Sequence, residues 1–191
     1  MNPPPRQIRN VALIGFMGCG KSTVGQALAR RLDFEFVDTD RLIEAQAGWS
    51  IPEIFAREGE AAFRARERGV VESLAARERL VIATGGGVGA QPDLLESLKR
   101  HALVVWLWAS PETLWERCRQ QTHRPLLQVP DPLARIRELL AAREPVYRRA
   151  DLLINIEGRA QWQLVGQIAS EFQRRTADAP SHESGHPGSR A

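Results

Sequence analysis

A glycine-rich segment near the N-terminus has the residue types and spacing of a phosphate-binding loop (P-loop). Residues 15–23 read GFMGCGKST, which fits the pattern G-x-x-x-x-G-K-[ST]. Glycines let backbone N–H groups wrap a phosphate chain, and the start of the following helix adds free N–H groups and a positive dipole end. We expect Lys21 to reach the β- and γ-phosphates of a nucleotide and Ser22 to hold Mg²⁺. The predicted nucleotide-binding residues of this loop are Gly18, Cys19, Gly20, Lys21, Ser22 and Thr23.

Two aspartates, Asp38 and Asp40, follow a short apolar stretch. In an extended chain, residues at i and i+2 point to the same side. Many P-loop enzymes carry the aspartate that orients Mg²⁺ at the end of another strand, but the strand expected at Arg79–Thr84 is followed by glycine. We therefore expect Asp38 to orient Mg²⁺ together with Ser22, through a bound water. Asp40 is then placed to accept a hydrogen bond from a substrate hydroxyl and to deprotonate it. The alternative is a helix cap before Arg41–Ala47, a role that one of the two aspartates can combine with the first.

Three consecutive glycines, Gly85–Gly87, come directly after an apolar strand. Ordering three glycines is costly, which favours a role in which the backbone must approach a ligand closely and donate N–H groups to a carboxylate or hydroxyl. A flexible turn is the alternative.

Arginines are the other candidates for binding an anion, because the planar guanidinium pairs with carboxylates and phosphates. Arg64, Arg124 and Arg143 stand out by their position, Arg124 within a segment that reads as a mobile flap. The chain contains 24 arginines, however, and a single arginine is usually a solvated surface residue. By contrast there are only two lysines, so a lysine at position 21 of so arginine-rich a chain indicates a specific need.

The elements that must position these residues alternate along the chain. Short apolar strands are expected at Val11–Gly15, Phe34–Val37, Arg79–Thr84, Ala102–Trp108 and Asp151–Ile156. Helices are expected at Lys21–Leu32, Arg41–Ala47, Glu60–Arg77, Pro92–Leu98, Pro111–Arg119, Asp131–Tyr147 and Ala160–Arg174. This alternation predicts an α/β fold with a mostly parallel sheet covered on both faces. Ligands of such sheets bind beyond the carboxyl ends of the strands, where the aspartates and glycines lie.

Length and composition bound the remaining possibilities. With 191 residues, 43% hydrophobic and 26% charged, the chain suits one soluble domain, here over residues 10–175, between a flexible leader (1–9) and a disordered tail (176–191). No apolar run could span a membrane and no secretory signal is visible, which predicts a cytoplasmic location. The net charge is +3, but the basic residues are scattered among acidic ones, so nucleic acid is not expected. Cys19 and Cys118 read as ordinary reduced thiols.

Taken in order, GFMGCGKST, FVDTD, FR at 63–64, GGG at 85–87, RPLL at 124–127 and REPVYRRAD at 143–151 have the spacing found in the shikimate kinases. From about residue 10 to 172 the chain resembles this family. The resemblance implies a three-layer P-loop kinase fold similar to nucleoside monophosphate kinases, with a five-stranded parallel sheet flanked by helices. It also implies a lid at about 119–131 and a small helical substrate-binding insert at about 39–66.

The resemblance implies that the chain, with Mg²⁺, transfers the γ-phosphate of ATP to the 3-hydroxyl of shikimate, giving shikimate 3-phosphate and ADP, in the biosynthesis of aromatic amino acids. The substrate carboxylate would be held by Arg64 and Arg143. The hydroxyls would meet Asp40 and the backbone at Gly86.

For the nucleotide, the resemblance implies that Arg124 on the lid contacts the ATP phosphates and stabilises charge during transfer. Arg117 would lie along the adenine ring. The catalytic residues would be Asp40, Lys21 and Arg124, and the apolar wall of the insert would be Phe55 and Phe63. The loop after Ile156 gives little to match.

Two other readings remain. A small-molecule kinase of the same fold, such as a gluconate kinase, would keep the P-loop and lid but not necessarily the DTD, FR and GGG motifs. A non-catalytic relative would be expected to lose Lys21, Asp40 or an anion-binding arginine, and none is lost. We expect a monomer whose partners are shikimate and ATP, without nucleic acid or membrane.

Overall fold

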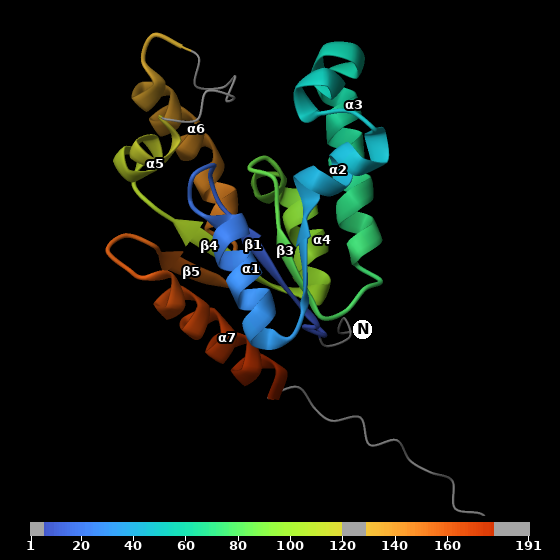
Figure 1. Cartoon of the computed structure of the whole chain (residues 1–191), viewed down its shortest axis with the longest axis vertical. Coiled ribbons are helices and arrows are strands. Elements are labelled where there is room, and N and C mark those ends of the chain that lie inside the picture. Colours follow the sequence, from blue (N-terminus) through green and yellow to red (C-terminus); the bar gives the residue numbers. More distant parts are fainter. Residues whose placement is uncertain (1–5, 120–128, 178–191) are drawn as a thin grey trace, which may run out of the picture.

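A five-stranded, all-parallel sheet forms the centre of the molecule, with the strand order β2-β3-β1-β4-β5 (Figure 1). The computed structural model describes residues 6–119 and 129–177. The strands are β1 (Asn10–Ile14), β2 (Glu35–Asp38), β3 (Leu80–Ala83), β4 (Ala102–Trp108) and β5 (Leu152–Asn155). Every residue of β1 and β3 is buried, as expected for central strands that carry apolar side chains on both faces.

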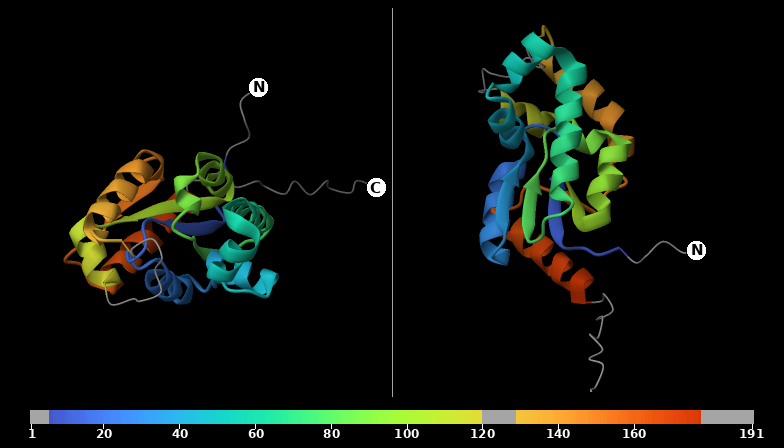
Figure 2. Two further views of the ribbon diagram at one scale, coloured as in Figure 1. Left: turned by 90° about the horizontal axis from the view of Figure 1, so that it is seen from above. Right: turned by 90° about the vertical axis from the view of Figure 1, so that its right-hand side faces the viewer.

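Helices cover both faces of this sheet (Figure 2). One face carries α1 (Lys21–Leu32) and α7 (Gln161–Ala177), and the other carries α4 (Pro92–His101) and α6 (Pro132–Tyr147). Helix α5 (Pro111–Cys118) packs against α6. The predicted three-layer α/β fold with a five-stranded parallel sheet is therefore confirmed.

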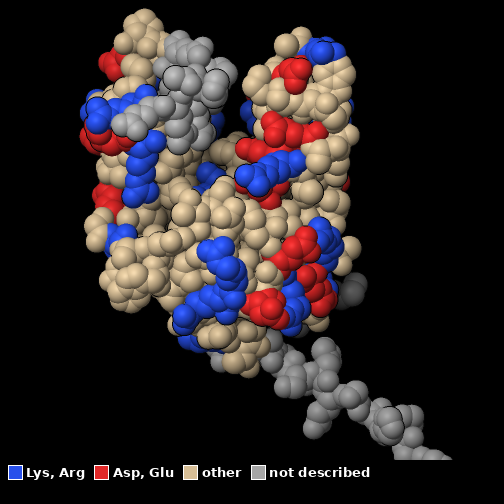
Figure 3. All heavy atoms as spheres, in the orientation of Figure 1, with Lys and Arg blue, Asp and Glu red and all other residues tan. Residues whose placement is uncertain are grey.

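Two further helices, α2 (Thr39–Ala47) and α3 (Ile51–Leu74), rise beside the end of the sheet that contains β2 and β3 (Figure 1). Helix α3 is interrupted at Gly59, whose φ of 81° and ψ of 176° are accessible essentially to glycine alone. The segment before the break begins with a capping box between Ser50 and Glu53. In the space-filling view the molecule is hollowed between the α2–α3 side and the α5–α6 side (Figure 3).

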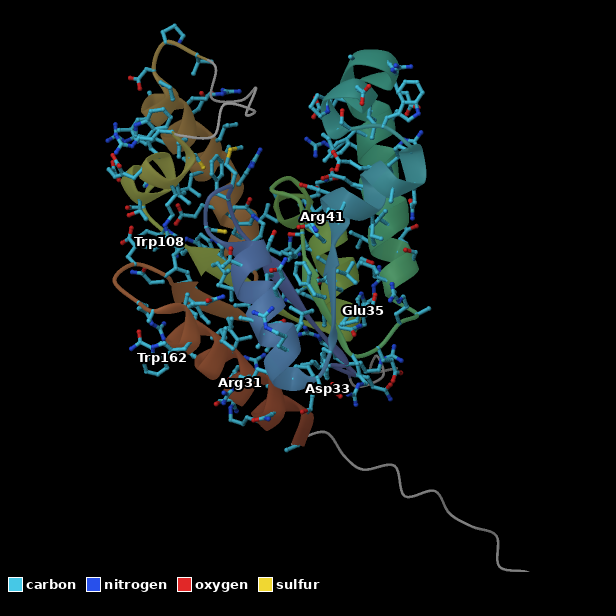
Figure 4. The ribbon with its side chains drawn as sticks, in the orientation of Figure 1. Arg31, Asp33, Glu35, Arg41, Trp108 and Trp162 are labelled. Atoms are coloured by element: carbon cyan, nitrogen blue, oxygen red, sulfur yellow. The ribbon has the colours of Figure 1, made fainter. Side chains whose placement is uncertain are left out.

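Strand β2 brings the chain to this hollow. Figure 4 places Arg31, Asp33 and Glu35 around the turn between α1 and β2, at the end of the molecule away from the hollow, and Arg41 at the other end of the strand. The chain reverses at Asp33, which adopts a left-handed conformation with a φ of 55°. The carboxyl end of β2 and the first turn of α2 therefore lie at the hollow.

The two ends of the domain differ from the sequence-based expectation. Residues 6–9 were expected to belong to a flexible leader, but Arg6 pairs with Asp151 at 2.6 Å and the Arg9 N–H donates to the His101 carbonyl at 2.9 Å. Helix α7 also continues to Ala177, two residues into the predicted tail. Within the described ranges, no helix has the length and apolar character that crossing a bilayer requires.

Candidate active site

The P-loop joins β1 to α1 with three glycines in left-handed backbone conformations. Gly15, Gly18 and Gly20 have φ values of 138°, 81° and 85°, which side-chain-bearing residues rarely adopt. Gly20 is the N-cap of α1, so the helix begins at Lys21 and directs its first N–H groups at the loop. The Lys21 ammonium donates to the carbonyls of Gly15 at 2.8 Å and Phe16 at 3.1 Å. The loop therefore has the shape of a phosphate cradle, with its lysine folded across it.

Cys19 lies within this loop but its side chain is not presented to solvent. The residue is 1% exposed, and a Cβ added to Gly15 would come within 3.0 Å of its sulfur. The Cys19 side chain is therefore packed into the protein beneath the loop. Among the described residues there is also no cluster of three or more acidic, histidine or cysteine side chains that could hold a metal ion by itself.

Asp38 ends β2 and divides its two carboxylate oxygens between two tasks. Oδ1 accepts hydrogen bonds from the N–H groups of Asp40 at 3.1 Å and Arg41 at 3.4 Å, so Asp38 is the N-cap of α2. Oδ2 accepts a hydrogen bond from the Ser22 hydroxyl at 2.9 Å. One aspartate of the predicted pair thus serves as a cap and still presents an oxygen beside the P-loop serine.

Asp40 lies in the first turn of α2 and has an unusual environment. Burial, the charge of Asp38 and, to a smaller extent, the charges of Glu67 and Glu44 raise its pKa to about 6, although Lys21 acts in the opposite direction. Its Oδ1 is buried and has no hydrogen-bond partner among the described residues. A carboxyl group with such a pKa is suited to accept a proton near neutral pH.

The triple glycine follows β3. Its lack of side chains leaves room for neighbouring groups, and its backbone conformation is not one that requires glycine. None of its residues is among the glycines with positive φ. A Cβ at Gly85 would overlap the Asp40 carboxylate, and a Cβ at Gly87 would overlap the Arg64 guanidinium. The Gly85 N–H donates to the hydroxyl of Thr39 at 2.8 Å, which fixes the loop against α2. The close approach predicted for a ligand is thus made here by two side chains of the protein.

Arg64 projects from α3, after the Gly59 break, and contacts two carboxylates. Its Nη1 donates to Glu67 at 2.6 Å, while Nε and Nη2 donate to Glu60 at 3.2 and 3.0 Å. Burial lowers the pKa of Arg64, but these two carboxylates outweigh burial and raise the pKa above its usual value. Glu67 is itself buried and also accepts a hydrogen bond from Gln91 at 3.1 Å.

Arg143 reaches the same loop from α6. Its Nη1 donates to the Gly86 carbonyl at 3.1 Å, and its guanidinium carbon lies 5.2 Å from the centre of the Phe16 ring. The hydroxyl of Tyr147, one helical turn further, donates to the same carbonyl at 2.8 Å. Arg64 and Arg143 thus converge on the triple glycine from opposite sides of the hollow.

A cleft of about 530 Å³ runs along the P-loop and reaches Asp40 and Gly86, whereas Arg64 and Arg143 are not among the residues that line it. Of the predicted residues it is lined by Gly18, Cys19, Gly20, Lys21, Ser22, Thr23, Asp38, Asp40, Gly86 and Arg117. Its far end is closed by Ile156, Arg159, Gln161 and Leu164, which sequence reasoning did not assign. Glu157 fixes this end, since it accepts hydrogen bonds from the N–H and hydroxyl of Ser110 and from the hydroxyl of Thr113 at 2.5 to 2.9 Å.

Phe55 and Phe63, the two residues predicted to form an apolar wall, contact each other. The rings of Phe55 and Phe63 lie 4.7 Å apart, one on each side of the Gly59 break. Arg124, the lid residue in the sequence-based set, lies outside the described residues, as does most of the expected lid.

Comparison with protein families places the chain clearly. Residues 17–174 match the family model described as shikimate kinase. The shikimate kinase of Symbiobacterium thermophilum is 48% identical over 169 residues, covering 87% of this chain and 97% of the relative. A shikimate kinase of Thermus thermophilus is 47% identical over 171 residues, covering 89% of this chain and 93% of the relative.

Solved structures agree. A shikimate kinase from Acinetobacter baumannii in complex with shikimate has a TM-score of 0.82 at 40% identity, covering 89% of this chain and 96% of that one. A gluconokinase from Sinorhizobium meliloti, at 19% identity and a TM-score of 0.59, covers 91% of this chain and 96% of that one and shares the fold alone. The similarity therefore favours one family within a widely used fold.

Proposed function

The chain belongs to the shikimate kinase family, and on that premise we propose that it transfers the γ-phosphate of ATP to the 3-hydroxyl of shikimate, giving shikimate 3-phosphate and ADP. The observation that carries the residue assignments is the position of Asp40. This carboxyl, with a pKa of about 6 and a buried oxygen without a partner among the described residues, lines one cleft with the P-loop lysine and Gly86. A carboxylate whose pKa is near 6 is ionised at neutral pH and can accept the proton of the acceptor hydroxyl.

ATP would occupy the P-loop end of the cleft. The β- and γ-phosphates would take the loop N–H groups and the N-terminus of α1, and Lys21 would exchange its two loop carbonyls for phosphate oxygens. Arg117, which lines the cleft beyond the loop, would lie along the adenine ring, with Arg159 and Gln161 nearby. Arg124 of the lid would add positive charge over the transferring phosphate.

The donor set fits Mg²⁺. The ion usually keeps several waters and takes only one or two protein groups besides the phosphates. Ser22 and Asp38 offer a hydroxyl and a carboxylate oxygen 2.9 Å apart on the cleft wall, and the second oxygen of Asp38 is already used by the cap of α2. When bound, the ion would neutralise charge between the β- and γ-phosphates; Ser22 would contact it directly and Asp38 through water.

Shikimate would lie against the triple glycine. Arg64 and Arg143 approach this loop from α3 and α6, which lets two guanidinium groups share one carboxylate. The ring would rest against Phe55 and Phe63, and its hydroxyls would reach Asp40 and the backbone at Gly86. Asp40 would orient the 3-hydroxyl and take its proton as the phosphate is transferred.

The test is a coupled ATP-consumption assay with shikimate as acceptor. We expect ADP formation that depends on shikimate and is abolished by a chelator of Mg²⁺ and restored by excess Mg²⁺. Gluconate and nucleoside monophosphates serve as controls and should be inert. No turnover with shikimate would overturn the proposal, and turnover with gluconate instead would favour the other small-molecule kinase.

We also propose that the chain acts as a monomer in the cytoplasm. Every group assigned above comes from one chain, so a second copy is not needed to complete the cleft. Light scattering after gel filtration should give a mass near the 21.3 kDa of one chain. A dimer with full activity would contradict this assignment without affecting the proposed reaction.

A further inference from the structure

The guanidinium of Arg64 is shared between two carboxylates whose surroundings differ strongly. The side chain of Glu67 is 1% exposed, while that of Glu60 is 67% exposed. Both lie on α3, three residues after and four residues before Arg64. The residue proposed to bind the substrate carboxylate is therefore already paired with two carboxylates of the protein.

Glu67 is a permanent partner. It accepts a hydrogen bond from Nη1 of Arg64 at the short distance of 2.6 Å and another from Gln91. Separating Glu67 from Arg64 would leave a buried carboxylate without its cationic partner, which is costly. It fixes one end of the guanidinium and leaves the opposite edge, formed by Nε and Nη2, for another group.

Glu60 occupies that opposite edge, and its hold is weaker. A single oxygen, Oε1, accepts from Nε at 3.2 Å and from Nη2 at 3.0 Å, and Arg64 is its only hydrogen-bond partner among the described residues. The Nε–Nη2 edge is one of the two on which a carboxylate binds arginine with two parallel hydrogen bonds. Glu60 thus sits where a ligand carboxylate would make a better, two-oxygen contact.

We propose that Glu60 stands in for the substrate carboxylate on Arg64 in the free protein, and that shikimate must displace it to bind. This inference rests on the proposed function. A displaced Glu60 has a favourable place to go, because it is exposed to water and lies in the first turn after the Gly59 break, where the N-terminus of the second helical segment favours a negative charge. Displacement therefore leaves no carboxylate buried and unpaired.

The expected change in the KM for shikimate follows from the fraction of free protein in which Glu60 is paired with Arg64, here called the closed state. Exposed ion pairs of this kind favour the closed state by a factor of about 1.4 to 5. Since only the open fraction can accept the substrate, the apparent KM is raised by one plus that factor, about two- to six-fold. Removing the charge of Glu60 should lower the KM by the same ratio.

The experiment compares Glu60→Gln with Glu58→Gln. Both remove one negative charge from the insert and keep the size of the side chain, but Glu58 pairs with Arg66 on the other side of the break and does not contact Arg64. We expect Glu60→Gln to lower the KM for shikimate about two- to six-fold, with kcat and the KM for ATP unchanged. Glu58→Gln should leave the KM for shikimate unchanged.

Binding of a neutral analogue, the methyl ester of shikimate, gives a second readout. An uncharged ester has little to gain from displacing Glu60, so calorimetric titration should give the same affinity in wild-type and Glu60→Gln proteins. A purely structural role of Glu60 would instead weaken both ligands.

An unchanged or raised KM for shikimate in Glu60→Gln, with normal wild-type turnover, overturns this inference and leaves the proposed function intact. An equal fall in Glu58→Gln also overturns it, because general electrostatics would then suffice. No shikimate turnover by the wild-type chain overturns the proposed function and this inference together.

Discussion

Two partly buried aspartates lie at opposite ends of the same parallel sheet, and their pKa values are shifted in opposite directions. Asp151 precedes β5 at the amino edge, where burial would raise its pKa but hydrogen bonds from Arg6 and the Val104 N–H outweigh burial and lower it. Asp40 follows β2 at the carboxyl edge, where burial and the charge of Asp38 raise its pKa to about 6. One fold thus gives the same side chain two different tasks.

The difference lies in the partners and not in the burial alone. Both oxygens of Asp151 are used, since Arg6 contacts both at 2.6 and 2.7 Å and the Val104 N–H donates at 2.8 Å. Oδ1 of Asp40 has no such partner among the described residues. A satisfied carboxylate stabilises the fold, whereas an unsatisfied one retains the capacity to bind a ligand and accept a proton. Perturbing each aspartate should therefore affect different quantities.

The largest expected effect is that of Asp40→Asn on turnover. Loss of the base should lower kcat by about 100- to 10,000-fold, measured in the coupled assay with saturating substrates. The KM values should change much less. An unchanged kcat would remove Asp40 from the catalytic residues.

The same substitution should stabilise the protein. The folded-state pKa of about 6 lies above the ordinary value of 3.8, so the ionised carboxylate destabilises the fold above pH 6. At pH 7.5 we expect Asp40→Asn to raise the free energy of unfolding by about 1 to 3 kcal/mol, measured with urea. The gain should disappear as the pH is lowered from 6 towards 4. Destabilisation at pH 7.5 would contradict the proposed environment of Asp40.

Arg143→Ala should weaken the binding of shikimate without weakening the binding of ATP. Truncation of a charge-paired contact should raise the KM for shikimate about 30-fold or more, while ATP affinity stays nearly constant. Arg148→Ala is the matched control, because Arg148 is exposed at the end of the same helix and pairs with Glu144. A loss of ATP affinity in Arg143→Ala would show that the contact with Phe16 matters more than the contact with Gly86.

At the amino edge, Asp151→Asn should act on stability alone. Breaking the Arg6 pair should lower the free energy of unfolding by about 1 to 3 kcal/mol, a value below that of fully buried pairs because Arg6 is partly exposed. The kcat at 25 °C should stay within about two-fold of wild type, as expected for a site remote from the chemistry. Asp33→Asn, which removes the charge from a surface ion pair with Arg79, should cost less than about 0.5 kcal/mol. A lower kcat in Asp151→Asn, with an unchanged free energy of unfolding, would contradict the assignment of Asp151 to stability and of Asp40 to catalysis.

The last prediction concerns the pH profile of the reaction. Because Asp40 must be ionised to accept a proton, kcat/KM should fall about ten-fold per pH unit below pH 6 and stay level up to about pH 8. Circular dichroism at pH 5 should confirm that the protein is still folded. A midpoint near 4 would mean that the environment does not raise the pKa of Asp40 in solution.

Much of this architecture could be predicted from the sequence, because local signals agree with the tertiary structure. The bounds of α1 and β4 are as predicted residue for residue, and the other strands differ by one residue at either end. The residue pattern alone did not predict the helical segment before Gly59, which only the resemblance implied, although Ser50-x-x-Glu53 with Pro52 is a capping signature. The polar, glycine-containing composition of the insert obscured that signal.

Site residues could be predicted where their place after a strand determines their position. Residues whose role depends on burial in the folded protein could not. Asp38 and Asp40 were found because they follow a strand in an α/β sheet. Glu67 was missed because it is one of many charged residues on α3, and its burial beside Gln91 and the triple-glycine loop is a tertiary feature. The purpose of the triple glycine was also only partly predictable, since the groups that crowd it come from α2 and α3.

The crowding of that glycine loop has a consequence for redesign of the enzyme. A side chain at Gly85 would require the Asp40 carboxylate to move from its present position, and a side chain at Gly87 would require the Arg64 guanidinium to move. Single substitutions at the two glycines should therefore displace two groups that are proposed to contact the substrate. Libraries that vary Gly87 and Arg64 together, with a shorter cation opposite an alanine, open routes to acceptors with a differently placed acid group.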